Sequence, residues 1–355
     1  MNVKALIRTV NHTLKLHDIF PENSRILVAC SGGPDSMALL HLLQDIATHR
    51  HTAYELGVAI VDHCIRSESK DEVLWLRNQV ERLGLPFYTA TVDVPKLSEE
   101  QKLSEETIGR QVRYQWLTDI AQSERYDYIA VAHHKDDQAE SILAHLIRGT
   151  GLNGLTGMAV VSNDYSIPVV RPLLDVTKEE LLLYLKEKDI SYCIDSTNED
   201  VRYQRNRIRH RIIPELKAIN PIVIDAIVRL GASVREDISL ISNLTDMAFD
   251  ELVTISDEGA FISRRGLRKK PLAIQRRLWQ RLVSIFDPEI KLTTAHQEQL
   301  LDIVNTGEEK TFNIKSIKVS AQCDTIKVYC KHYYESRRSY RCIKMQKIFY
   351  IQRNN

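Results

Sequence analysis

Along residues 1–215, short apolar runs alternate with longer stretches in which apolar residues recur at helical spacing. The apolar runs predict strands, and the stretches that follow them predict helices. This order is typical of an α/β fold with a Rossmann-like parallel sheet and helices on both faces. The predicted strands are Arg25–Cys30, Leu56–Asp62, Pro86–Val92 and Tyr128–Ala132, and the predicted helices are Ser36–Thr48, Lys70–Leu83, Ser104–Ser123 and Asp137–Leu146.

The pattern changes after Asn220 and Pro221. A long helical stretch and a basic segment are followed by another helix and three short β-like runs, which predicts a smaller mixed α+β domain. We therefore expect a first domain at 1–215, a second domain at 216–330 and a basic tail at 331–355. The segments of the second domain are Ile222–Val253, Arg264–Arg281, Thr294–Val304, Thr311–Ile314, Ile317–Ala321 and Thr325–Tyr329.

Composition narrows the class of protein. Of 355 residues, 43% are hydrophobic, and 48 Lys and Arg against 47 Asp and Glu give a net charge of +1. Disorder needs low hydrophobicity and high net charge, so the chain is expected to be globular. Because the net charge is close to zero, a nucleic acid would have to bind to local basic patches. No apolar run approaches the roughly 18 residues of a membrane-spanning helix. Met1 to Phe20 lack the unbroken apolar core of a secretory signal.

The six cysteines form no C-x-x-C pair. This argues against a zinc ribbon and against a dithiol redox motif. Scattered thiols suit a reducing compartment, so a cytoplasmic location is expected.

The strongest motif, Ser31-Gly32-Gly33-Pro34-Asp35-Ser36, separates the first predicted strand from the first predicted helix. Its glycines let backbone N–H groups approach an anion, and the helix start adds unpaired N–H groups and a positive dipole end. The motif is not a Walker A loop, because no lysine follows the glycines, and its spacing is not that of G-x-G-x-x-G. A carboxylate beside phosphates is repulsive unless a cation separates them, so Asp35 implies Mg²⁺. The alternative is an ordinary strand-to-helix turn.

A second motif, His133-His134-Lys135-Asp136-Asp137-Gln138-Ala139-Glu140, follows the strand Tyr128–Ala132 and opens a helix. Asp137 and Glu140 share one helical face. Two histidines and three acids at one strand end predict a site for Mg²⁺ or for the ammonium group of an amino-acid substrate. The alternative is that the acids only complement the helix dipole.

Two further motifs contain arginines on predicted helices or beside strands. Arg66 follows the second strand in Asp62-His63-Cys64-Ile65-Arg66, and Arg110 and Arg113 lie on one face of a helix. Arginine pairs equally well with a carboxylate or a phosphate. Each motif is therefore either part of a ligand site or a salt-bridged surface.

Two acid-free basic runs indicate more strongly than these motifs that the protein binds a polyanion. Arg202 to Arg211 contains five arginines, and Arg264 to Arg281 contains eight Lys and Arg with Trp279 among them. Basic side chains neutralise phosphates and an aromatic ring can stack on an unpaired base. A solvated helix face is the alternative. Between the acidic motif and these runs, Gly149 to Gly157 holds four glycines in nine residues, which indicates a loop shaped by its backbone.

The Ser31–Ser36 loop resembles the SGGxDS loop of the N-type ATP pyrophosphatases, a superfamily with an adenine nucleotide α-hydrolase-like fold. The full set of motifs resembles the tRNA(Ile)-lysidine synthetase family, which similarly carries H-x-L-R-x-x-S-x-x-E, E-x-x-A-R-x-x-R-Y, H-H-x-D-D-Q-x-E, R-G-x-G-L-x-G-L-x-G-M and D-x-S-N followed by R-N-x-I-R-x-x-x-x-P. The departures are small: Ile65, Gly109 and Thr197 replace Leu, Ala and Ser. The matching motifs cover residues 26–214.

The resemblance implies a ligase that joins free L-lysine to carbon 2 of the wobble cytidine in the CAU-anticodon isoleucine tRNA. The base oxygen attacks the α-phosphate of ATP, pyrophosphate leaves, and the lysine amine then displaces AMP to give lysidine, which pairs with A. The implied partners are this tRNA and lysine, with ATP as substrate and Mg²⁺ as cofactor. A homodimer is left open. Many members continue into a further β-rich C-terminal domain, and this chain stops near where it would begin.

Carried onto this sequence, the motifs assign four overlapping groups of residues. The catalytic group is Asp35, Asp137, Glu140, Arg113 and Arg205; the ATP-binding group is Ser31, Gly32, Gly33, Pro34, Asp35, Ser36, His63 and His133; the tRNA-binding group is Arg66, Arg110, Arg202, Arg209, Arg276 and Arg277; and the metal ligands are Asp35 and Asp136.

Three other functions share parts of this pattern. A tRNA 2-thiolating enzyme uses the same ATP chemistry but usually needs paired cysteines. A small-molecule ATP pyrophosphatase, such as an amide synthetase, does not need the two basic runs. An inactive RNA-binding protein does not need the acids Asp35, Asp136, Asp137 and Glu140.

Overall fold

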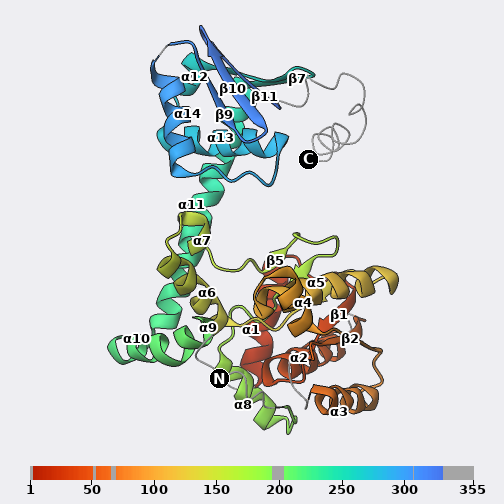
Figure 1. Cartoon of the computed structure of the whole chain (residues 1–355). Helices are drawn as coiled ribbons and strands as arrows, with labels where there is room; N and C mark the ends of the chain where they lie inside the picture. The colour runs from red at the N-terminus through yellow and green to blue at the C-terminus, as the bar shows by residue number, and fades with distance from the viewer. Residues whose placement is uncertain (1–2, 51–52, 65–68, 194–203, 307, 331–355) are drawn as a thin grey trace. The chain divides into compact units, whose positions relative to one another are not determined.

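The computed structural model describes residues 3–50, 53–64, 69–193, 204–306 and 308–330. It contains two compact units, Met1–Arg235 and Glu236–Asn355 (Figure 1). The division falls within helix α11 (Val223–Leu252), beyond residue 215, where the sequence pattern predicts the end of the first domain. The two positions differ because α11 runs without interruption from one unit into the other, and a continuous helical pattern does not mark a domain boundary in the sequence.

A six-stranded sheet forms the centre of the first unit, with the order β3-β2-β1-β4-β6-β5. All neighbouring strands are parallel except β5, which pairs with β6 in the antiparallel sense. The strands are β1 (Arg25–Ala29), β2 (Glu55–Asp62), β3 (Phe87–Thr91), β4 (Tyr128–Ala130), β5 (Val161–Ser162) and β6 (Val169–Val170). The four predicted strands are thus confirmed, whereas the two short strands β5 and β6 were not predicted.

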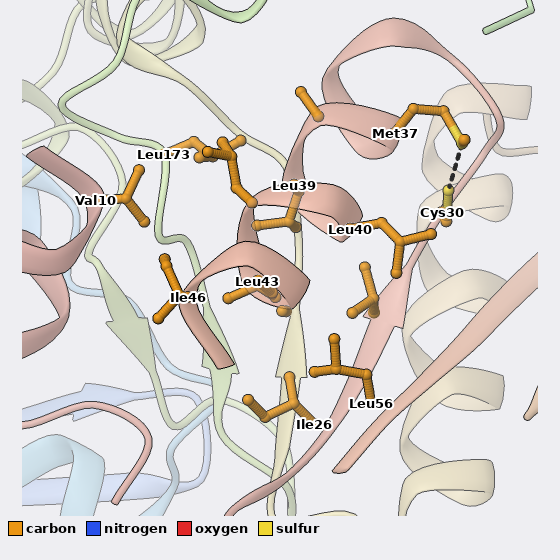
Figure 2. Close-up of a cluster of buried hydrophobic side chains, with 14 of the residues drawn as sticks. Val10, Ile26, Cys30, Met37, Leu39, Leu40, Leu43, Ile46, Leu56 and Leu173 are labelled. Atoms are coloured by element: carbon orange, nitrogen blue, oxygen red, sulfur yellow. Dashed lines mark hydrogen bonds between the residues drawn. The ribbon is translucent and has the colours of Figure 1, made fainter. Parts of the chain in front are cut away.

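Helices cover both faces of this sheet because alternate residues of its strands are apolar and point to opposite faces. Ile26 and Val28 of β1 face a core that includes residues of α1, α2, α3 and α8, whereas Leu27 faces a core with α5. Figure 2 shows Leu39, Leu40 and other buried side chains of α2 in the first core. These helices are α1 (Val3–Leu16), α2 (Pro34–Arg50), α3 (Ser69–Arg82), α5 (Glu105–Ser123) and α8 (Lys178–Glu187).

A smaller cluster holds the end of the first unit against α6 (Lys135–Arg148). Ile208 and Ile213 pack with Ala139 of α6 and Ile224 of α11. Residues after 203 therefore lie beside a helix more than fifty positions earlier in the chain. The remaining elements of this unit are α4 (Val94–Gln101), α7 (Leu152–Leu155), α9 (Gln204–Arg207), a π-helical turn (Ile208–Ile212) and α10 (Ile213–Ile219).

The second unit contains a five-stranded antiparallel sheet in the order β7-β8-β11-β10-β9. Its core joins the sheet to three helices of this unit and to the end of α11, and it includes Trp279, Leu282 and Val328. The strands are β7 (Val253–Ser256), β8 (Gly259–Ser263), β9 (Lys310–Ile314), β10 (Ile317–Gln322) and β11 (Thr325–Cys330), and the helices are α12 (Arg264–Arg268), α13 (Leu272–Phe286) and α14 (Thr294–Thr306). The mixed α+β prediction is confirmed, although the β7–β8 hairpin was missed because β7 continues directly from α11.

Candidate active site

The candidate site lies at the carboxyl ends of β1 and β4. The strand order reverses here, since β2 and β3 lie on one side of β1 and β4 and β6 on the other. Open α/β sheets bind ligands at such a topological switch point. The Ser31–Ser36 loop follows β1, and the motif that begins at His133 follows β4, so the fold brings the two strongest sequence motifs together.

The Ser31–Ser36 loop is held by its own hydroxyl groups. The Ser36 hydroxyl donates to the Gly33 carbonyl at 2.9 Å and accepts from the Ser31 N–H at 3.2 Å. Gly32 adopts a φ of +80°, which favours glycine, and α2 begins at Pro34 directly after the turn. The loop therefore places a helix start and its unpaired N–H groups beside the end of β1, as an anion site requires.

Asp35 of this loop contacts two cationic side chains. Lys178, the first residue of α8, donates its Nζ to Asp35 Oδ1, and His134 Nε2 lies 3.7 Å from Asp35 Oδ2. Burial opposes ionisation of this carboxyl, but His134 and Lys178 together hold its pKa below the ordinary value. The lysine that the loop lacks in sequence is thus supplied from a helix 143 positions further along the chain. Sequence reasoning missed Lys178 because nothing local connects it to the loop.

His134 is buried among three acids. Its ring nitrogens lie 3.7 Å from Asp35, 3.7 Å from Asp136 and 3.4 Å from Asp137. Burial of the ring opposes protonation, yet the contact with Asp35 and the surrounding negative charges raise the pKa of His134 above its ordinary value. His134 thus connects the loop after β1 with the helix after β4. Its backbone N–H also donates to Asp137 Oδ2 at 3.0 Å, which caps α6.

Asp137 and Glu140 form a compact ion-pair network with two arginines. Arg205 donates to Glu140 Oε2 and to Asp137 Oδ1, both at 2.9 Å. Arg209 donates to both oxygens of Glu140, at 2.6 and 3.0 Å, and to Asp137 Oδ1 at 3.0 Å. The Glu140 side chain is only 1% exposed, so both of its oxygens meet guanidinium groups away from water.

The sequence explains how these arginines reach α6. Arg205 lies in α9 and Arg209 in the π-helical turn that follows, four positions later, so both point to one side. Ile208 between them packs against Ala139 and fixes that side toward α6. Arginines of the acid-free run therefore form ion pairs with acids of α6. Burial opposes ionisation of Asp137, but His134 and Arg205 outweigh it and lower the pKa of Asp137 to about 2.

His63 and Arg113 also meet. Arg113 Nη2 lies 3.2 Å from His63 Nε2, and because a guanidinium only donates, this nitrogen of His63 accepts. Burial of the ring, with the Arg113 charge, lowers the pKa of His63 to about 4, so this imidazole is neutral at pH 7. The two predicted side chains are therefore neighbours, at the carboxyl end of β2 and on α5.

The glycine-rich loop is fastened to α6 by a residue that sequence reasoning did not single out. The Gln138 side chain donates to the Met158 carbonyl at 2.8 Å and accepts from the Met158 N–H at 2.6 Å. Gly157 adopts a φ of +66°, and a Cβ there would come within 2.6 Å of the Gln138 amide oxygen. A glycine at position 157 therefore leaves the space that the buried Gln138 amide occupies.

The remaining predicted residues lie in different places. Arg66 and Arg202 fall outside the described residues. Arg110 stacks on the Tyr114 ring at 4.8 Å in the first unit, whereas Arg276 and Arg277 lie on α13 of the second unit.

The expectation that Trp279 stacks on a base is wrong, because this ring is 1% exposed in the core of the second unit. Part of the basic run around it is also structural. Arg268 donates to the carbonyls of Val304 and Asn305, and Arg281 pairs with Asp246.

The donor set fits one kind of metal ion. Within the described part of the chain, no three His, Cys, Asp or Glu side chains are grouped to hold a metal. Asp35 and Asp136 both face His134 and offer oxygen atoms. Mg²⁺ is typically bound by one or two carboxylates together with substrate phosphates and water, so carboxylates of this kind are compatible with Mg²⁺ that arrives with a nucleotide.

Comparison with known proteins identifies close relatives. The tRNA(Ile)-lysidine synthase of Porphyromonas gingivalis is 35% identical over 269 residues, which cover 75% of this chain and 56% of that protein. The tRNA(Ile)-lysidine synthase of Clostridium acetobutylicum is 30% identical over 311 residues, which cover 87% of this chain and 66% of that protein. The chain therefore spans 56 to 66% of the length of these relatives. The resemblance inferred from the motifs is confirmed.

A solved structure supports the fold. The U34-tRNA thiolase NcsA from Methanococcus maripaludis, with its 4Fe–4S cluster, superposes with a TM-score of 0.57 at 20% identity, over 66% of this chain and 78% of that one. Across the described residues, no helix is long and apolar enough to cross a membrane. The family model described as a PP-loop domain matches residues 4–216, which is more than half of the chain. This chain therefore belongs to the PP-loop family of ATP-binding proteins.

Proposed function

We propose that this protein ligates free L-lysine to carbon 2 of the wobble cytidine in the CAU-anticodon isoleucine tRNA, in the cytoplasm, with ATP converted to AMP and pyrophosphate. One observation carries the proposal: His134 lies within 3.7 Å of Asp35 in the loop after β1 and within 3.4 Å of Asp137 on α6. A phosphate-binding turn and an acidic helix therefore belong to one site. The similarity to tRNA(Ile)-lysidine synthases supports the choice of substrates.

In the first step, the 2-oxygen of the cytosine forms a bond to the α-phosphorus of ATP, and the bond to the β-phosphate oxygen breaks. The protein positions the triphosphate and compensates its charge. The N–H groups of the Ser31–Ser36 loop and the start of α2 face the phosphates, and Lys178 adds a positive charge beside Asp35. Arg113, held by neutral His63, is a further cation that can meet a phosphate oxygen.

We expect magnesium to take part in this step, because carboxylate and phosphate oxygens are the ligands that it prefers. When bound, it would be held by Asp35 and Asp136 with the phosphates and would offset their negative charge. The protein's own part is to hold both carboxylates beside His134, with Lys178 against Asp35.

In the second step, the ε-nitrogen of lysine bonds to carbon 2, the carbon–oxygen bond breaks, and AMP leaves while the amine loses its protons. Asp137 and Glu140 are the proposed anchors for this amine. The pKa of Asp137 is about 2, which makes it a weak base and a strong electrostatic partner for an ammonium group. Arg205 and Arg209 already satisfy these acids, so a substrate amine has to join the network or replace a guanidinium.

The tRNA is proposed to contact basic residues of both units. The candidates among the described residues are Arg110 and Arg209 in the first unit and Arg276 and Arg277 on α13 in the second. Arg276 is exposed, and Arg277 is partly exposed with one guanidinium nitrogen bonded to the Ala273 carbonyl. Charge reversal at Arg276 and Arg277 is expected to weaken tRNA binding at moderate salt while ATP binding survives.

The decisive experiment mixes the protein with ATP, isotopically labelled lysine and the CAU-anticodon transcript. The proposal expects AMP release that requires the tRNA, and a tRNA mass increased by one lysine less one water. A transcript with uridine at the wobble position, and the Asp35→Ala variant, serve as controls without product. Incorporation of labelled sulfide in place of lysine would instead support the 2-thiolating alternative, and AMP release without tRNA would support a small-molecule amide synthetase.

A further inference from the structure

Arg171 is a buried cation to which the sequence motifs assign no role. It follows β6 directly and is 5% exposed. Its Nη1 donates to the Ala159 carbonyl at 2.9 Å, whereas its Nε is buried without a hydrogen-bond partner. Within the described part of the chain, no Asp or Glu forms an ion pair with it, in contrast to Arg205 and Arg209.

The Arg171 guanidinium is buried with one of its donors, Nε, unsatisfied. Burying a charge is costly unless the charge is paired, and buried donors in folded proteins are nearly always satisfied. Burial lowers the pKa of Arg171, and the charge of Arg110 acts in the same direction, although Tyr114 and Asp164 partly offset both effects. A buried cation with an unused donor and a second cation nearby is the arrangement expected of a site for a small anion.

The fold places Arg171 at the same sheet edge as the acidic motif. Val170 of β6 pairs with Ala130 of β4, and the Val131 N–H donates to the Val170 carbonyl at 2.9 Å. Arg171 therefore leaves the sheet one strand away from the segment that continues to His133. Burial, together with the charges of Arg171, Arg205 and Arg110, outweighs the opposing effect of Asp137 and lowers the pKa of His133 to about 3, so this imidazole is neutral at pH 7.

Aromatic rings define the outer side of this group. The Arg110 guanidinium lies 4.8 Å from the Tyr114 ring centre, and Tyr114 stacks on Tyr165 with centroids 4.9 Å apart and an interplanar angle of 8°. Tyr114 is buried, so the stack is part of the fold rather than a surface contact. Arg110 is thereby held over a fixed platform near Arg171.

We propose that Arg171 binds the α-carboxylate of the amino-acid substrate, with Arg110 above Tyr114 adding positive charge nearby. The assignment rests on the proposed function, in which the same substrate presents its side-chain amine to Asp137 and Glu140. Arg171 follows β6, and Asp137 and Glu140 lie on the helix after the neighbouring strand β4, so the site offers cations and anions to the two ends of a lysine, which carries opposite charges separated by a four-carbon stem. At 5% exposure Arg171 lies too deep for the bulky backbone of RNA, whereas a carboxylate matches the planar fork of a guanidinium.

The test compares lysine with cadaverine, the same diamine without the carboxylate, as acceptors in tRNA-dependent AMP release. The variants are Arg171→Gln and Arg171→Lys, and the matched control is Arg25→Gln, an arginine at the opposite, amino-terminal edge of the same sheet. The proposal expects wild-type protein to favour lysine. It expects R171Q to raise the KM for lysine by about 10- to 100-fold, the range of a charged hydrogen bond, with little change for cadaverine or for the KM of ATP. R171K is expected to lie between, because a single ammonium replaces the fork.

The outcomes are distinguishable. Absence of lysine transfer by wild-type protein contradicts the proposed function itself. Transfer by the wild type with equal losses for lysine and cadaverine in R171Q overturns the carboxylate assignment and leaves a structural role. A raised KM for tRNA with a shallower salt dependence overturns it in favour of a phosphate contact. If neither variant folds, the wild-type preference decides, since equal use of lysine and cadaverine refutes carboxylate recognition.

Discussion

The ion-pair network on α6 predicts a large local cost for removing one charge. Glu140→Gln keeps the shape of the side chain but replaces a carboxylate that accepts three guanidinium hydrogen bonds, at 2.6, 2.9 and 3.0 Å. Breaking a buried ion pair by removing one partner costs about 3–5 kcal/mol. The lower end, about 3 kcal/mol, applies here because the Arg205 and Arg209 side chains are 37% and 34% exposed and regain some water.

Hydrogen exchange measures this cost locally, because the two units need not unfold together. At pH 7, backbone amides of α6 in E140Q are expected to exchange on the order of 100-fold faster than in the wild type, which corresponds to about 3 kcal/mol. Glu187→Gln, a change at an exposed glutamate of α8, is the matched control and should leave α6 unchanged. The reasoning is refuted if E140Q exchanges like the control. It is equally refuted if E140Q and Arg209→Gln add fully in the double variant, because contacting residues must couple.

Three further predictions concern the same site. Asp137→Asn should remove a pH dependence of the free energy of unfolding. The pKa of Asp137 is about 2 in the folded protein against an ordinary 3.8, so its ionised form stabilises the wild type by about 2 kcal/mol above pH 3.8, and this contribution is lost as the pH falls toward 2. Urea unfolding of both proteins at pH 5 and pH 2.5 measures the difference. Lys178→Ala should raise the KM for ATP by about 10-fold or more in pyrophosphate release, with Lys178→Arg less affected and the exposed Lys186→Ala unchanged, since Lys178 contacts Asp35 and Lys186 is a surface residue of the same helix. Equal effects of K178A and K186A would contradict this role. Gln138→Ala should speed hydrogen exchange in residues 148–158 by about 10-fold through the loss of two hydrogen bonds, and Gln138→Glu should do more because it sets a carboxylate against the Met158 carbonyl; unchanged exchange in both would exclude the clamp.

The sequence predicts the first unit well because its signals are local. Strands such as Arg25–Ala29 are short apolar runs, and the Ser31–Ser36 loop and the His133–Glu140 motif each carry their chemistry within a few residues. The switch point then follows from strand order, which short connections and handed crossovers constrain strongly.

What the sequence does not predict is which distant side chains complete the site. Lys178 reaches Asp35, and Arg205 and Arg209 reach α6, only because hydrophobic packing brings α8 and the residues after 203 to the same edge. Arg171 is also hidden, because one arginine after a two-residue strand has no periodic signal. Trp279 shows the converse error: a basic stretch with an aromatic ring reads as an RNA surface, although helical spacing buries that ring in a core.

The charge balance of the site changes the argument for magnesium. From sequence, Asp35 beside phosphates implies a cation because the two repel each other. In the structure the acids already face basic side chains: Lys178 and His134 at Asp35, and two guanidinium groups at Asp137 and Glu140. Much of the negative charge of these acids is therefore compensated by the protein itself, which is why a buried acid such as Glu140 can be tolerated. A triphosphate would add several negative charges that these partners do not offset, so we expect a cation to arrive with the nucleotide.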